Sequence, residues 1–209
     1  MTPLLKPHPG LSGVTRLHRL AHRSENVSWL EWLTLIGVGI VTAALSALVD
    51  VHVRIPGHAI LKVVFPVAAG LAMVPRRGAG STIGGSALIT ALGMRMAGFG
   101  GEGLGFGALT SLTVIGPALD WTLRHARSGR AVYIGFVLAG LFTNLVALVV
   151  RGTLKGLGWE HAGGRPLASW LAQASITYVL CGIVAGLVSA AVWFAARPAE
   201  ETEKQEPLS

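Results

Sequence analysis

Residues 131–150 read AVYIGFVLAGLFTNLVALVV, a run of 20 residues without a charged side chain. An α-helix needs about 20 mostly apolar residues to cross the hydrocarbon core of a bilayer, so this run predicts one membrane-spanning helix. Five further uncharged runs occupy residues 32–49, 63–75, 78–94, 103–119 and 166–196. We therefore expect about six transmembrane helices.

Two of these runs depart from the ideal length. The run at 63–75 is short and contains Pro66, so we expect its helix to extend outward past Lys62, whose long side chain reaches the interface. The run at 166–196 is too long for one upright span. We expect residues 166–170 to lie along the membrane surface before the helix enters near Gln173.

The composition favours a membrane protein over a nucleic-acid-binding one. The 209 residues are 52% hydrophobic and 13% charged, about half the charged fraction of ordinary soluble domains. The net charge of +7 comes from basic residues between the apolar runs rather than along one helical face. A single cysteine, Cys181, excludes a disulfide framework. The expected fold class is an all-α integral membrane protein, a bundle of about six transmembrane helices in a lipid membrane.

The distribution of basic residues predicts the orientation. With the N-terminus inside, 11 of the 17 Lys and Arg residues fall on the cytoplasmic side, as the positive-inside rule requires. We expect a basic cytoplasmic tail at 1–28, a transmembrane domain at 29–196 and a charged cytoplasmic tail at 197–209. Both termini would then be cytoplasmic, in a multi-pass protein of the cell inner (cytoplasmic) membrane.

The first candidate site is the outer loop at 50–58, which reads DVHVRIPGH. Asp50, His52, Arg54 and His58 would supply donors and acceptors to a polar solute at the mouth of the bundle. Asp50, His52 and His58 are also a possible set of ligands for a metal ion. The alternative is a solvated loop whose charges only end the helix.

Other polar residues are candidates for contact with the same solute. Glu102 lies in the glycine-rich segment 98–107, which no strand precedes, so nucleotide binding is not expected there. Asn144 and Gln173 lie inside apolar runs, where polar side chains either contact a ligand or join helices by hydrogen bonds. Arg151 and Lys155 are expected in a solvated charged loop.

Small residues at a spacing of four mark two helices, Ala43-x-x-x-Ala47 and Gly80-x-x-x-Gly84, and such spacing allows helices to approach closely. The chain lacks HExxH, GxSxG and Walker motifs. We therefore expect no enzyme and no cofactor, and any ATP-driven transport would need an ATPase on another chain.

Over residues 30–196 the pattern resembles the S components of energy-coupling factor (ECF) transporters. The likeness lies in Ala43-x-x-x-Ala47, in RIPGH at 54–58 and in AAGLAMVPRRG at 68–78. In that family a small membrane subunit binds a vitamin or a metal ion, and a separate transmembrane subunit with two ATPases drives uptake. The resemblance implies that Ala43, Ala44 and Ala47 face the coupling subunit and that the loop after the first helix caps the ligand.

The resemblance also orders the possible substrates. Cobalt and nickel members use a histidine near their mature N-terminus, which this chain lacks, so the expected cargo is a vitamin-like solute, with a transition-metal ion second. Two other classes stay open. A non-transporting scaffold or assembly protein would need no site, and a lipid-modifying enzyme would use a histidine and a carboxylate as acid and base.

Overall fold

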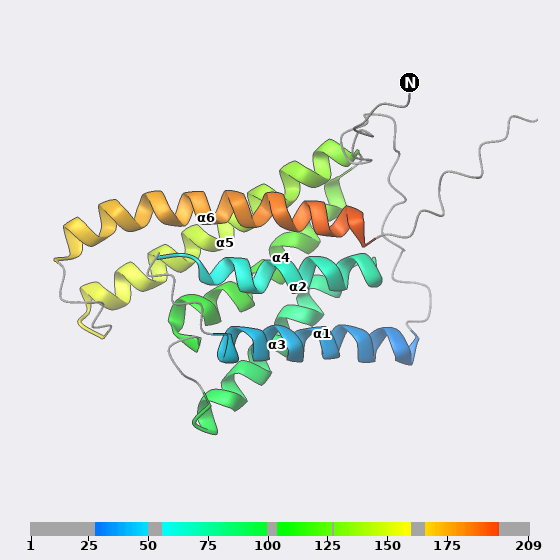
Figure 1. Ribbon diagram of the computed structural model, residues 1–209, viewed down its shortest axis with the longest axis horizontal. Coiled ribbons are helices and arrows are strands. Elements are labelled where there is room, and N and C mark those ends of the chain that lie inside the picture. The colour runs from blue at the N-terminus through cyan, green and yellow to red at the C-terminus, as the bar shows by residue number, and fades with distance from the viewer. Residues whose placement is uncertain (1–27, 50–55, 100–103, 127, 160–165, 197–209) are drawn as a thin grey trace, which may run out of the picture.

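A computed structural model describes residues 28–49, 56–99, 104–126, 128–159 and 166–196, and its regular elements are six α-helices (Figure 1). They are α1 (Trp29–Leu48), α2 (Ala59–Met73), α3 (Ala79–Met96), α4 (Phe106–His125), α5 (Gly129–Gly156) and α6 (Leu167–Ala195). The predicted all-helical fold and its number of helices are confirmed. Three helices, α1, α5 and α6, are long and apolar enough to span a membrane, which indicates a multi-pass membrane protein.

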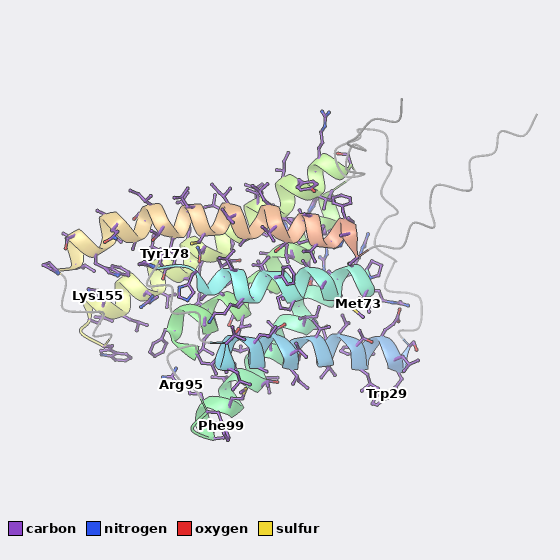
Figure 2. All side chains as sticks on the ribbon, in the orientation of Figure 1. Trp29, Met73, Arg95, Phe99, Lys155 and Tyr178 are labelled. Atoms are coloured by element: carbon purple, nitrogen blue, oxygen red, sulfur yellow. The ribbon has the colours of Figure 1, made fainter. Side chains whose placement is uncertain are left out.

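Consecutive helices run in alternating directions, so the bundle has two ends (Figures 1 and 2). We call one the Trp29 end, where α1, α3 and α5 begin. The other is the Lys155 end, where these three helices finish and α2, α4 and α6 begin. Three connections between helices lie at the Lys155 end and two at the Trp29 end.

The shortest helix, α2, is the centre of the bundle. It contacts all five other helices, α6 and α1 most extensively and α5 only slightly, whereas α1 and α6 pack on α2 rather than on each other. Most of its 15 residues are buried, including Pro66 at its middle. The predicted extension past Lys62 is confirmed, and the Lys62 Nζ donates a hydrogen bond to the carbonyl of Val49 at 2.8 Å.

Glycines set the distance between neighbouring helices. A side chain at Gly80 would meet the carbonyl of Gly116 on α4 at 2.7 Å, and one at Gly84 would meet the carbonyl of Leu112 at 2.8 Å. The close approach predicted from Gly80-x-x-x-Gly84 is therefore confirmed. Between α5 and α6, Gly140 faces the carbonyl of Gly182 in the same way. At such contacts backbone lies directly on backbone.

Helix α3 is capped by a residue of α4. Its own N-cap, Gly78, has φ +85° and provides no side-chain hydrogen bond. The carboxylate of Asp120 accepts hydrogen bonds instead from the N–H groups of Gly80 (3.0 Å) and Ser81 (2.8 Å). Asp120 is only 3% exposed, so this cap lies inside the bundle and fixes α3 against α4.

The last apolar run forms one continuous helix, and the prediction that its first residues lie along the surface was wrong. Helix α6 begins at Leu167, and Trp170 is buried with Ala174 and Tyr178 against Ala147 and Leu148 of α5. With 29 and 28 residues, α6 and α5 are each about 42 Å long. They project beyond the other helices at the Lys155 end (Figure 1).

Candidate solute site at the Lys155 end

The predicted site residues separate into two groups. Asp50, His52, Arg54 and Glu102 lie outside the described residues, so their contribution stays a prediction. The remaining candidates are described, and they are His58, Asn144, Gln173, Ala43, Ala44 and Ala47.

Tyr178 of α6 lies where several helices meet near the Lys155 end (Figure 2). Gly57, just before α2, has φ +90°, and a side chain there would lie 3.0 Å from the Tyr178 ring. Gly57 therefore contacts α6. Its positive φ and the lack of space for a Cβ beside Tyr178 both require glycine at this position. His58 follows directly, half-buried at the start of α2.

Asn144 joins α5 to α6. Its Nδ2 donates a hydrogen bond to the carbonyl of Tyr178 at 2.6 Å, and the side chain is 1% exposed. Of the two roles that the sequence left open, the structure shows the interhelical hydrogen bond. That bond joins the Tyr178 backbone to α5.

The prediction that Arg151 and Lys155 lie in a loop was wrong, because α5 continues to Gly156 and contains both residues. Arg151 lies one turn before Lys155. Its side-chain stem passes Gly107 of α4, where an added Cβ would be 3.0 Å from the Arg151 Cδ. Its Nη1 donates a hydrogen bond to the Tyr178 hydroxyl at 3.4 Å. Gly107 and Arg151 lie on different helices, so the sequence of either helix alone does not identify this contact.

Two more cations flank this position. The guanidinium of Arg95, at the end of α3, lies over the Phe106 ring at 5.2 Å, and the Lys155 ammonium lies over the Trp170 ring at 5.5 Å. Both contacts are within the range of cation–π attraction. Figure 2 places Arg95, Lys155 and Tyr178 at the same end of the bundle.

The other predicted residues are a glutamine of α6 and three alanines of α1. Gln173 is exposed on α6. Ala43 is completely buried in the main core, while Ala44 and Ala47 are half-buried on α1. Of the three alanines expected to face a partner, only Ala44 and Ala47 therefore keep exposed surface.

A metal centre has no support among the described residues, which contain no group of three His, Cys, Asp or Glu side chains able to hold an ion. Asp50 and His52 of the predicted metal set lie outside that part of the chain.

Comparison of the chain with protein-family models, with curated proteins and with solved structures returned no match. Function is therefore inferred from the chemistry and geometry of the Lys155 end.

Proposed function

We propose that this chain is the substrate-capture subunit of an ECF-type uptake transporter and binds a vitamin-like small solute near the Lys155 end. One observation carries the proposal: Gly57 before α2, Gly107 of α4 and Asn144 and Arg151 of α5 all surround Tyr178 of α6. Helices α4, α5 and α6 and the segment just before α2 thus meet at one aromatic ring, and α5 supplies two side-chain donors there.

Arg151 is the polar residue of this cluster that supports a ligand site, since the amide of Asn144 already joins α5 to α6. Asn144 and Arg151 lie in α5, one of the three helices able to span a membrane. Polar side chains are costly in such helices and commonly mark sites for solutes. The connections α1–α2, α3–α4 and α5–α6 all lie at this end, so a solute arriving from one aqueous side would meet the cluster.

The arginines at the opposite end support the proposed orientation. Arg77, Arg124 and Arg130 are exposed at the Trp29 end, beside the connections α2–α3 and α4–α5. Placing this end in the cytoplasm satisfies the positive-inside rule, with six spans and both termini cytoplasmic in the cell inner membrane. The coupling subunit and its ATPases would then be recruited in trans through α1, at Ala44 and Ala47.

The test is the thermal stability of the full-length protein in detergent against a panel of vitamins and divalent metals. Binding to the folded state raises the free energy of unfolding by about 2.7 kcal/mol at a hundredfold excess over Kd. The chain has two tyrosines, which give a matched pair of variants. Tyr178→Phe should weaken the shift, whereas Tyr133→Phe, stacked on Phe194, should leave it unchanged.

A scaffold is the second candidate, and one observation favours it. The half of the bundle toward the Trp29 end is filled by aromatic rings, with Phe136 and Trp193 buried and Tyr133 packed beside them. A filled bundle suits a protein that binds other subunits rather than a solute. The absence of a thermal shift with every compound would favour this reading over solute capture.

A further inference from the structure

Three exposed arginines stand beside the connections at the Trp29 end. Arg77 lies between α2 and α3, Arg124 lies in the last turn of α4, and Arg130 lies in the first turn of α5. Guanidinium groups exposed at one end of an apolar bundle create a region of positive potential there. This region lies at the end opposite the candidate solute site, so an inference from it goes beyond the proposed function.

No carboxylate among the described residues is left to pair with these arginines. The described ranges contain two acidic residues, Glu31 and Asp120, and both belong to the Trp29 end. Glu31 forms the ion pair with Arg76 at 2.9 Å. Asp120 is 3% exposed, and its carboxylate accepts hydrogen bonds from the Gly80 and Ser81 N–H groups. The charge of the three arginines therefore stays available to a partner from outside the described residues.

Each of the three arginines lies within four residues of a large, exposed apolar side chain. These side chains are Met73 before Arg77, Trp121 before Arg124 and Ile134 after Arg130. Indole rings such as that of Trp121 prefer the interface between acyl chains and water. The uncharged run 131–150 follows Arg130 directly, and its 20 residues make about 30 Å of helix, the thickness of the hydrocarbon core. Arg130 thus stands where acyl chains end and phosphate groups begin.

We propose that Arg77, Arg124 and Arg130 form a basic rim that binds the headgroups of anionic phospholipids in the leaflet at the Trp29 end. A guanidinium binds two phosphate oxygens through charge-assisted hydrogen bonds. The headgroup of phosphatidylglycerol has a net negative charge, whereas the choline of phosphatidylcholine neutralises its phosphate. Each basic side chain at an anionic surface strengthens binding by about fivefold, so the rim selects lipids by headgroup charge.

An acidic segment of this chain is the competing partner. Helix α6 ends at the same end of the bundle, and the sequence beyond it holds four glutamates, which are Glu200, Glu201, Glu203 and Glu206. The exposed apolar side chains beside the arginines favour lipid, because acyl chains cover such side chains and an acidic segment does not. A lipid therefore satisfies both the charges and the apolar surface next to them.

The experiment measures which phospholipids the full-length protein retains. The protein in detergent is incubated with an equimolar mixture of phosphatidylglycerol and phosphatidylcholine that have the same acyl chains. Excess lipid is removed by size-exclusion chromatography, and mass spectrometry counts the lipids that remain bound. The wild-type protein should retain phosphatidylglycerol with a preference of at least about tenfold. The preference should fall as salt is raised, because salt screens exposed charges.

Variants test whether the three arginines make the contact. The combined Arg77→Gln, Arg124→Gln and Arg130→Gln variant should retain the two lipids equally to within about twofold. The corresponding triple lysine variant keeps the charge and should retain most of the preference. Arg95→Gln removes an exposed arginine at the Lys155 end and should leave the preference unchanged. An unchanged thermal midpoint in phosphatidylcholine shows that each variant is folded.

Three outcomes would overturn the proposal. The first is equal retention of both lipids by the wild-type protein, and the second is a preference that the triple glutamine variant keeps. The third is an equal loss of preference in Arg95→Gln, which would show that the net charge matters and the rim does not. Equal retention that becomes a preference when the four glutamates at 200–206 are changed to glutamine would assign the arginines to the acidic segment instead of lipid.

Discussion

Asp120 on α4 holds Ser81 on α3 by two hydrogen bonds, one from the Ser81 backbone N–H at 2.8 Å and one from its hydroxyl at 2.6 Å. The two residues are 39 positions apart in the chain. The start of α3 is therefore defined by a side chain of the next helix. The cap of α3 is complete only when α3 and α4 are packed together.

We predict that Asp120→Ala destabilises the bundle by about 1–3 kcal/mol, because buried N–H groups at the start of α3 lose their acceptor. The measurement is the thermal midpoint of the purified protein, with Ser81→Ala as the comparison. Ser81→Ala removes one of the three hydrogen bonds and should cost less. An equal loss in both variants would contradict the role of Asp120 as a cap.

Gly84→Ala should destabilise the protein by about 1–3 kcal/mol, because the new Cβ would lie 2.8 Å from the Leu112 carbonyl and push α3 from α4. The neighbouring Gly85 is the matched control, since nothing lies within 4 Å of its Cβ position. Gly85→Ala should be neutral or stabilising by up to about 1 kcal/mol, as expected for alanine over glycine in a helix. The measurement is the thermal midpoint of both variants under the same conditions. An equal loss in both would contradict the close contact at Gly84.

The start of α1 and the turn before α3 are joined by an ion pair between Glu31 and Arg76. Arg76 makes two contacts of 2.9 Å, from Nε to Oε1 and from Nη2 to Oε2. Glu31 also completes the capping box of α1 by accepting from the Ser28 N–H. Glu31→Gln and Arg76→Gln should each lower the thermal midpoint.

The double variant of this pair should lose less than the sum of the two single losses, because both remove the same interaction. The coupling should weaken as salt is raised, since both side chains are partly exposed. Additive losses at low salt would show that Glu31 acts only through the capping box.

The proposed orientation is testable with single cysteines in a Cys181→Ala background. Arg77→Cys at the Trp29 end should be protected from a membrane-impermeant maleimide in intact cells and labelled after lysis. Trp159→Cys, in the exposed position after α5, should be labelled in intact cells. Labelling of both positions from outside would exclude the alternating six-span topology.

The helices were predictable from the sequence because an uncharged run of sufficient length has one stable form in a bilayer. Their arrangement was not. The central position of α2 depends on contacts with helices far along the chain, and nothing within residues 59–73 distinguishes a central helix from a peripheral one. Likewise, the surface segment expected at 166–170 failed because Trp170 finds a buried partner on α5 that only the fold supplies.

The candidate site was predictable in part. Asn144 was recognised because an amide in an apolar run needs a partner, but the identity of that partner, the Tyr178 carbonyl, needed the structure. Arg151 was assigned to a loop because a charge usually ends an apolar run. It lies within α5, and its stem packs against Gly107 on another helix. The sequence of α4 alone, or of α5 alone, does not show that Arg151 packs where Gly107 has no side chain.

The central helix also has a consequence for biogenesis. At 15 residues α2 is about 22 Å long, shorter than the hydrocarbon core, and it carries Lys62 and Pro66. Because α2 is short and carries a lysine and a proline, its insertion into lipid as an isolated segment would be unfavourable. Its extensive packing partner, α6, is the last of the six helices to leave the ribosome. The packing around α2 is therefore complete only when α6 has been synthesised, and before that only α1, α3, α4 and α5 are present to cover it.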